Sequence, residues 1–381
     1  MFRALGVILG TCLLGAACGT PGGLVHTDIP PLAGLPGRFD QATIDQAAEK
    51  VYLADGTLGA VDVFDVSQAR PRYVTSVKVG HAPHGMALAP DLHKLFVGLD
   101  GGGVAVLEAD PAARGVNTVL ATIATSARKN VDLVDYDPAA HVLWAASSDE
   151  GILTRIDAIR NRATIHMNLA AGLEQPRFNA GDHLLYLPNQ ARNVLYRINP
   201  DKLQVVQEWS LGVRCSPTGL GIDPRRQVAM LGCVDPGIAY TLEWNLAAGR
   251  VIRTFPQVSK ADQVVYDQPS DLYLVAGSSN GTTAAGFFGG TPVAYRSSKL
   301  THADTRAVAM DERSKVVYVP GAHPGDVGLI SFGLPPPEVA APPLLAPLLY
   351  LLPLVVVGIV VWYFGRKRER ERRLAGRPQF S

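Results

Sequence analysis

Residues 83–99 read PHGMALAPDLHKLFVGL, and this stretch decides the fold. It contains a junction at Pro83, a short apolar strand, a turn at Pro90-Asp91 and a second strand rich in β-branched, aromatic and leucine side chains, a composition that favours strands. The same layout recurs every 42 to 46 residues, and the repeats begin near Gly37, Pro83, Arg128, Glu174, Ser216, Ser259 and Ala303. Self-similarity at such a period indicates a repeat architecture.

Each repeat has a second strand at the same place: KVYLA from Lys50, KLFVG from Lys94, HVLWA from His141, HLLYL from His183, QVAML from Gln227, DLYLV from Asp271 and KVVYV from Lys315. A third strand follows a turn, in the order VDVFD, VAVLEAD, ILTRID, VLYRIN, AYTLEWN, PVAYR and VGLISF. Several third strands end in an Asp or Asn that starts a turn into a fourth strand: Asp65, Asp110, Asp157, Asn199 and Asn245. Seven units of four antiparallel strands predict an all-β, seven-bladed β-propeller over residues 24–333.

The last repeat is incomplete. It stops at Phe332, and a stiff Pro-rich linker over residues 334–343 leaves no room for a fourth strand. Leu24 to Leu35, LVHTDIPPLAGL, reads like the fourth strand and junction of the other repeats. We therefore expect the N-terminal segment to complete the last blade and close the ring, which removes its exposed sheet edges. An open solenoid is the structural alternative, and it does not explain the missing strand.

The repeats resemble the YVTN-type β-propeller family of secreted and periplasmic bacterial proteins. The residues that carry the resemblance are Pro83 to Asp91 followed by LHKLFVG, and VYLADGTLGAVDVFDV from Val51. The resemblance implies the architecture of seven-bladed propellers in the quinoprotein amine dehydrogenase and lactonase-like superfamily. It implies no reaction, because the family includes members with no known chemistry and sibling propellers include lactonases, a lyase and dehydrogenases.

Both ends of the chain carry targeting signals. Residues 1–18 read as a secretory signal sequence, and Cys18 after Leu14-Gly15-Ala16-Ala17 is a lipidation candidate, with ordinary cleavage near this point as the alternative. Leu344 to Phe364 is an uncharged run of 21 residues, which as a helix would rise about 31 Å and cross a membrane. The basic tail, 365–381, belongs in the cytoplasm by the positive-inside rule. We thus expect a bacterial cytoplasmic-membrane protein whose propeller lies on the extracytoplasmic side.

Composition limits the partners and the chemistry. The chain is 47% hydrophobic and 18% charged with a net charge of +1. The tail alone carries seven basic residues against two acidic ones, so the rest of the chain is mildly acidic and nucleic acid is not expected as a partner. No nucleotide-binding, zincin or c-type haem motif is present, and no cofactor is evident. Cys215 and Cys233 lie at the two ends of a hairpin that turns near Arg225, so a disulfide is expected in an oxidising compartment. Two buried thiols are the alternative.

Alignment of the repeats places one polar residue per blade around the channel mouth: Asp40, His84, Asn130, Gln175 or Arg177, Thr218, Asp262 and Arg306. Such a ring suits a polar ligand, a divalent metal ion or ordered water. The stretch Ser278 to Thr291 reads as a long Gly-rich loop on the same face, with Phe287 and Phe288 as a contact loop. Packing of the two rings against a neighbouring blade is the alternative.

Two functions follow from this pattern. The first is a membrane-anchored extracytoplasmic module that binds or scaffolds a small polar ligand or a protein partner on the loop face. The second is a propeller enzyme, such as a lactone hydrolase, a lyase or a dehydrogenase-like protein, that uses His84 with Asp40 or Arg306 at the channel mouth. No set of acid, base and nucleophile stands out in the sequence, and this favours the first.

Overall fold

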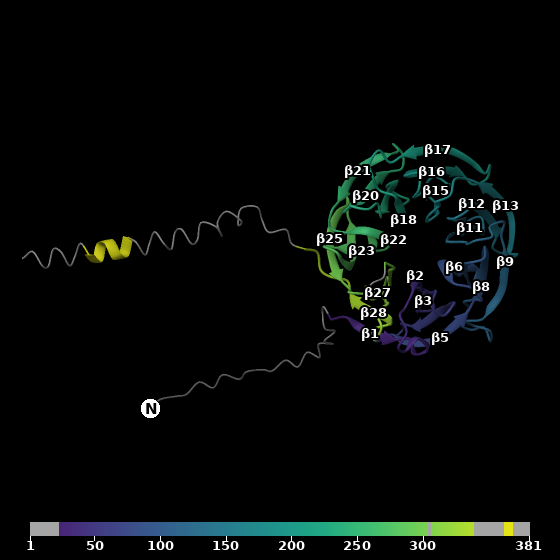
Figure 1. Ribbon diagram of the computed structural model, residues 1–381, viewed down its shortest axis with the longest axis horizontal. Coiled ribbons are helices and arrows are strands. Elements are labelled where there is room, and N and C mark those ends of the chain that lie inside the picture. The colour runs from purple at the N-terminus through teal and green to yellow at the C-terminus, as the bar shows by residue number, and fades with distance from the viewer. Residues whose placement is uncertain (1–22, 304–305, 339–361, 369–381) are drawn as a thin grey trace, which may run out of the picture. The chain divides into compact units, whose positions relative to one another are not determined.

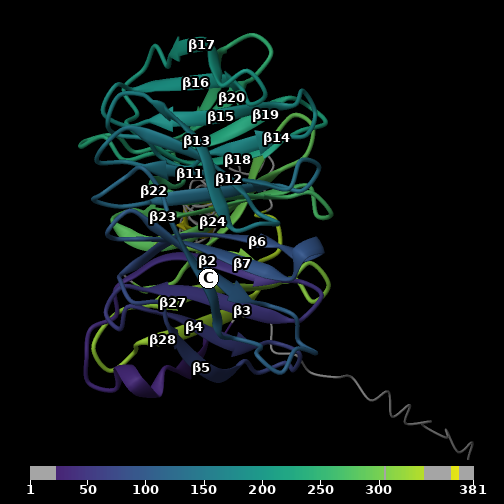
Figure 2. The same ribbon diagram turned by 90° about the vertical axis from the view of Figure 1, so that its right-hand side faces the viewer.

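The chain folds into a ring of seven four-stranded antiparallel sheets (Figure 1). This computed structural model describes residues 23–303, 306–338 and 362–368. Figure 2 shows the ring from its side, where the strands cross its thickness. The predicted all-β, seven-bladed propeller is confirmed.

The first three blades follow one another along the chain. Blade 1 consists of β2 (Phe39–Asp45), β3 (Lys50–Asp55), β4 (Ala60–Asp65) and β5 (Arg72–Lys78). Blade 2 consists of β6 (Pro83–Ala89), β7 (Lys94–Leu99), β8 (Gly103–Glu108) and β9 (Val119–Ala124). Blade 3 consists of β10 (Leu133–Asp137), β11 (Val142–Ser147), β12 (Ile152–Asp157) and β13 (Arg162–Asn168).

The remaining blades repeat this order. Blade 4 consists of β14 (Arg177–Asn179), β15 (Leu184–Asn189), β16 (Val194–Asn199) and β17 (Gln204–Ser210). Blade 5 consists of β18 (Pro217–Asp223), β19 (Val228–Cys233), β20 (Thr241–Asn245) and β21 (Arg250–Phe255). Blade 6 consists of β22 (Ser259–Asp267), β23 (Leu272–Ser279), β24 (Thr282–Gly289) and β25 (Ala294–Leu300). Blade 7 consists of β26 (Ala309–Met310), β27 (Val316–Gly321), β28 (Gly328–Gly333) and β1 (Val25–Asp28), and two short 3-10 helices span Pro30–Leu32 and Pro90–Leu92.

The N-terminal segment closes the ring as expected. Strand β1 pairs with β28 from Val25 opposite Ser331 to Asp28 opposite Gly328. In Figure 1 the purple β1 therefore lies beside the yellow-green β28. Ile29 and Leu32 follow β1 and are buried in the cluster shared by blades 7 and 1. Burial of these two side chains and the pairing of β1 with β28 together stabilise the closed ring.

Burial explains why the sequence forms these strands. Second strands such as β11 are buried at every position, because neighbouring blades cover both of their faces. Fourth strands such as β13 and β17 are largely exposed at the rim. A continuous apolar run is typical of the first situation and a polar strand of the second. Within each repeat, apolar strands are therefore the buried ones and polar strands are the exposed ones.

Turn chemistry repeats from blade to blade. The residue before each second strand has a positive φ between 49° and 57°: Glu49, His93, His141, His183, Gln227, Asp271 and Lys315. These three histidines are turn residues on the face opposite the channel mouth. The expected turns after the third strands are also present, because backbone N–H groups donate to the side-chain oxygens of Asp65, Asp110, Asp157, Asn199 and Asn245.

The predicted contact loop in blade 6 is wrong. Ser278 to Thr291 forms most of a hairpin, with β24 as the third strand, a turn at Asn280-Gly281 and the start of the next turn at Gly290-Thr291. Phe287 is 1% exposed and packs toward blade 7, and Phe288 is 0% exposed and packs against Phe255 of blade 5, with ring centroids 5.0 Å apart. The rings point to opposite faces of one strand and fill both interfaces of the blade. The expectation that PVAYR forms the third strand is therefore wrong: Pro292 and Val293 lie in the turn after β24, and the remaining three residues begin the fourth strand, β25.

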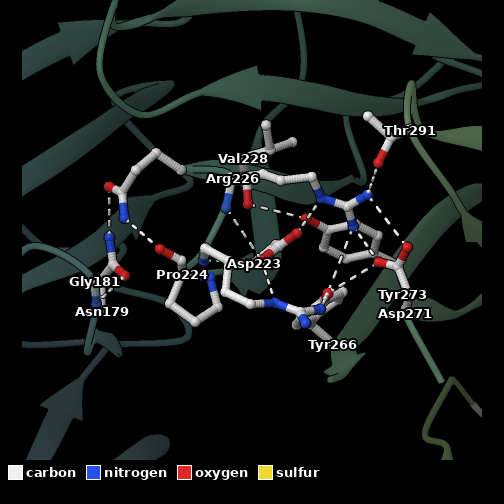
Figure 3. Close-up of polar contacts among 12 residues, drawn as sticks. Asn179, Gly181, Asp223, Pro224, Arg226, Val228, Tyr266, Asp271, Tyr273 and Thr291 are labelled. Carbon is white, nitrogen blue, oxygen red and sulfur yellow. Dashed lines mark hydrogen bonds and ion pairs between the residues drawn. The ribbon is translucent and has the colours of Figure 1, made fainter. Parts of the chain in front are cut away.

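Arg226 links blades 5 and 6 through polar contacts on the face of the ring opposite the channel mouth, here called the turn side (Figure 3). Arg226 donates to the fully buried Asp223, to Asp271 and, at 2.7 Å, to the carbonyl oxygen of Gly290. Tyr266 also donates to Asp271, at 3.0 Å. The buried carboxylate of Asp223 needs this partner, because an unpaired buried charge costs several kcal/mol. The polar groups of this cluster hydrogen-bond to one another, so we assign it a structural role between the two blades.

The predicted segments at the chain ends fall mainly on residues that are not described. Residues 1–22, with the signal sequence and Cys18, lie outside the described residues, as do 339–361 of the linker and the expected span. Residues 362–368 are helical and belong to a separate unit from the propeller. Within the described residues, no helix is both long and apolar enough to cross a membrane.

Candidate ligand site at the channel mouth

A Pro-x-Gly junction positions the polar residues at the mouth. In blade 2 the backbone N–H of Gly85 donates to the Asp132 carbonyl oxygen at 2.6 Å, and a Cβ on Gly85 would lie 2.7 Å from the Cα of Leu133. In blade 5 a Cβ on Gly219 would lie 2.4 Å from the carbonyl oxygen of Asp262. Only glycine permits these approaches of one blade to the next. The preceding residues, His84 and Thr218, are thereby held at the mouth.

The mouth opens on a small acidic cavity of about 160 Å³. Its lining consists of Asp40, Gln41, Asp132, Leu133, Glu174, Gln190, Thr218, Asp262 and Gln263. Four of these residues carry carboxyl groups, and none of the described lining residues is Lys, Arg or His. The cavity therefore favours a ligand that carries positive charge.

Three glutamines form the floor. Gln41 Nε2 donates to Gln175 Oε1 at 2.6 Å, and Gln41 Oε1 accepts from the Met86 backbone N–H at 3.0 Å. Gln263 accepts from the backbone N–H of Val308 at 3.0 Å and donates to the Ala42 carbonyl oxygen at 2.9 Å. These bonds connect five of the seven blades through the channel. Gln41 and Gln263 also line a second cavity of about 330 Å³, so the glutamine layer separates two compartments.

His84 is surrounded by carboxylates. Its Nδ1 lies 2.7 Å from Asp40 Oδ2 and 3.7 Å from Asp132 Oδ1, and its Nε2 lies 2.8 Å from Asp100 Oδ1. Burial alone lowers the pKa of His84, but the hydrogen bond and charge of Asp40, together with Asp100 and Asp132, outweigh it and raise the pKa to about 9. Both ring nitrogens are thus engaged by acidic side chains of blades 1, 2 and 3.

Two of the carboxyl groups inside the cavity, those of Asp132 and Glu174, have raised pKa values. Burial and the nearby charge of Asp40 raise the pKa of Asp132 to about 7, against the opposing effect of His84. Burial and the charges of Asp132, Asp262 and Asp40 raise the pKa of Glu174 to about 9. Glu174 is 9% exposed, and its carboxyl group has no hydrogen-bond or ion-pair partner among residues 23–303 and 306–338. A cationic group in the cavity would relieve both the burial and the repulsion.

The structure does not bring all of the predicted ring residues together. Asp40, Thr218 and Asp262 line the cavity. His84 bonds to Asp40 at its edge, and Arg306 forms an ion pair with Asp262 at 3.3 Å. Asn130 accepts from the Ser147 hydroxyl at 3.1 Å and does not line the cavity.

Arg177 lies in the other compartment. It forms an ion pair with Asp135 at 2.9 Å, donates to the Leu220 carbonyl oxygen at 2.9 Å and lines the larger cavity instead. Gln175 is part of the floor. Three acidic residues of the mouth, Asp100, Asp132 and Glu174, are absent from the predicted ring. Asp132 occupies the place expected for Asn130, two residues further along the junction.

The disulfide expected from the blade 5 hairpin is present in the structure. It joins Cys215 to Cys233, with Cα atoms 4.5 Å apart, and both residues are fully buried. The bridge ties the junction before β18 to the end of β19, next to the Pro-x-Gly turn that carries Thr218. It therefore braces the backbone at one side of the mouth.

Comparisons with known proteins show the fold alone. No protein-family model matches the chain, and no curated protein matches it. A chain in the solved "Crystal Structure of Mitotic Checkpoint Complex" is similar with a TM-score of 0.66 and 14% sequence identity, over 88% of this chain and 98% of that one. In all, 1564 solved chains are similar, so the propeller fold selects no particular function. The resemblance to YVTN-type repeats stays a prediction.

Proposed function

We propose that this chain is a membrane-anchored, extracytoplasmic binding propeller whose ligand or partner enters the channel mouth with a positively charged group. The observation that carries the proposal is the cavity of about 160 Å³, which four residues with carboxyl groups line and no cationic residue among those described lines. Carboxyl groups so close together repel when ionised. A cationic group would remove that repulsion in the bound state only.

The engagement of the polar side chains favours binding over general-base catalysis. Both nitrogens of His84 face carboxylates, and Arg306 is paired with Asp262. A general base needs a free lone pair near its substrate, and as long as no cation is bound both nitrogens of His84 are hydrogen-bonded to carboxylates. His84, Asp40 and Arg306, the residues expected to act in catalysis, are therefore better explained as charged groups at the edge of a binding cavity.

Sequence features support the proposed location. The signal-like residues 1–18, the uncharged run from Leu344 to Phe364 and the basic tail together favour export with a C-terminal anchor. The Cys215–Cys233 disulfide is consistent with an oxidising compartment. The similar solved chain belongs, by its title, to a protein complex, which is compatible with a propeller that holds a partner.

A thermal-shift screen tests the binding site. The full-length chain in detergent would be melted with a panel of small amines, guanidinium compounds and basic peptides, and with matched acids as controls. A ligand at 100 times its Kd should stabilise the protein by about 2.7 kcal/mol. Glu174→Gln and Asp132→Asn should abolish the shift, whereas Asp182→Asn, far from the cavity on the turn side, should keep it. A cationic ligand that stabilises all of these proteins equally would refute the assignment of the mouth.

A further inference from the structure

Three donor atoms at the rim of the cavity lie close enough together to share one metal ion. His84 Nδ1 lies 2.7 Å from Asp40 Oδ2 and 3.7 Å from Asp132 Oδ1, and one ligand atom of each residue lies within 4.8 Å of the other two. Nitrogen and oxygen donors about 2.0 to 2.2 Å from a shared ion are roughly 3 to 4 Å from one another. The pair at 3.7 Å has this spacing, and the pair at 2.7 Å is a hydrogen bond that would have to lengthen slightly when an ion replaces its proton. We propose that His84, Asp40 and Asp132 bind a first-row divalent metal ion of the Zn²⁺ class.

Asp100 supplies the partner that a metal-bound histidine needs. Its Oδ1 lies 2.8 Å from His84 Nε2, on the side of the ring away from Asp40 and Asp132. An Nε2–H that donates to Asp100 leaves the lone pair of Nδ1 directed at the two carboxylates. This carboxylate–histidine–metal arrangement fixes the ring and its tautomer. Asp100 is therefore a positioning residue rather than a ligand.

Glu174 gives independent evidence that a cation belongs in the cavity. It is 9% exposed and lines the same cavity as Asp40 and Asp132, and within the described part of the chain its carboxyl group has no partner. A buried carboxyl group without a donor is costly. A metal ion on the rim places positive charge beside it, through the ion itself or through a metal-bound water.

The donor set points to the class of metal. One imidazole and two carboxylates suit Zn²⁺ and its neighbours, whereas Ca²⁺ takes six to eight oxygen ligands. Three protein ligands would leave a coordination position open, and Asp40 and Asp132 belong to the lining of the cavity from which a molecule could reach it. This inference rests on the proposed function of the mouth. It adds that the metal ion is the positively charged group that meets the carboxylates, so a bound molecule would contact it.

Equilibrium dialysis with Zn²⁺ tests the site directly. The full-length chain, purified in detergent and stripped with a chelator, would be dialysed against Zn²⁺ and its bound metal counted. We expect one Zn²⁺ per chain, at least 100-fold weaker binding in His84→Gln and Asp132→Asn, and about 10- to 100-fold weaker binding in Asp100→Asn. His141→Gln, a turn histidine on the opposite face, should bind like the wild type. Co²⁺ should give a visible absorption band that His84→Gln shifts or removes.

The outcomes separate the metal from the binding site. Absence of saturable Zn²⁺ binding by a folded wild-type chain, or equal binding by the wild type and His84→Gln, overturns the metal site. Because Asp100 only positions the histidine, Asp100→Asn reports on the site even if a ligand variant unfolds. If Zn²⁺ does not bind but an amine still shifts the melting temperature through Glu174, the proposed function stands without the metal. If Zn²⁺ binds and no molecule responds to the mouth variants, the metal site stands alone.

Discussion

Two buried carboxyl groups in blade 1 predict an unusual dependence of stability on pH. Asp55 and Asp62 are both 0% exposed and lie diagonally on one face of the β3–β4 pair, where Asp55 is opposite Ala60. Asp55 Oδ1 accepts from the backbone N–H groups of Thr57 and Leu58, and Asp62 Oδ1 accepts from the Ser76 hydroxyl. Neither second oxygen, Oδ2, has an N–H or hydroxyl donor among the described residues. A proton held between the two carboxyl groups satisfies both.

The sign and size of the effect follow from the retained proton. Burial raises the pKa of both groups, and the charge of Asp55 adds to the rise for Asp62, whose pKa reaches about 8. The unfolded chain loses this proton near pH 4, whereas the folded chain keeps it until about pH 8. The stabilisation is therefore complete below pH 4 and is lost as the pH rises to 8. One proton corresponds to about 1.4 kcal/mol per pH unit, or roughly 2.7 kcal/mol between pH 5 and 7.

Substitution of Asp62 should remove this dependence. In Asp62→Asn the amide can donate to Asp55 at any pH, so the unfolding free energy of the variant should gain roughly 2.7 kcal/mol on the wild type between pH 5 and 7. Urea unfolding of the full-length chain, followed by tryptophan fluorescence, measures both proteins. Asp65→Asn on the same strand is the matched control, because hydrogen bonds from Lys50 and Ser67 lower the pKa of Asp65, which stays charged throughout. Parallel stability curves for the wild type and Asp62→Asn would refute the shared proton.

Other parts of the chain give three further predictions. Replacement of both Cys215 and Cys233 by Ser should lower the unfolding free energy by about 3 kcal/mol, because the bridge closes a loop with a sequence separation of 18; equal urea midpoints would contradict this. Deletion of residues 24–35 should expose the edge of β28 and cause aggregation in light scattering, whereas an unchanged melting temperature would mean that β1 does not hold the ring. Protease added to spheroplasts should digest the propeller and spare a tag after Ser381, and digestion of the tag would reverse the proposed topology.

The period, the strand order and the closure could be predicted because each has a local physical cause. Continuous apolar runs mark strands that are covered on both faces, and Asp or Asn after the third strand starts a turn through its own side chain. The closure was predictable because the Pro-rich segment after Phe332 cannot form a strand. In each case one segment carries enough information to determine its conformation.

The error in blade 6 shows where local information fails. Glycines near Phe287 suggest a loop, yet Gly286 lies inside β24, where a Cβ would approach Val258 Cγ2 to 2.4 Å. Glycine is there because the neighbouring segment packs against the strand, and only the tertiary structure reveals that contact. The same holds for the site: Asp100, Asp132 and Glu174 enter the mouth from junctions and a loop of unequal length. Their convergence depends on how blades 2, 3 and 4 pack together.

The propeller fold itself does not require carboxyl groups at the channel mouth. In blade 5, Thr218 occupies the junction position that Asp132 and Glu174 occupy in blades 3 and 4. Its hydroxyl donates to the Ala261 carbonyl oxygen at 2.6 Å, so a neutral residue fits there without loss of hydrogen bonding. Glu174 and Asp132 instead place buried acidic groups beside each other, each at a cost of about 1 to 3 kcal/mol when it lacks a donor. Natural sites accept such costs where function needs the group. If so, Glu174→Gln should unfold at a higher urea concentration than the wild type and yet lose ligand-dependent stabilisation, a combination that a purely structural role for Glu174 does not produce.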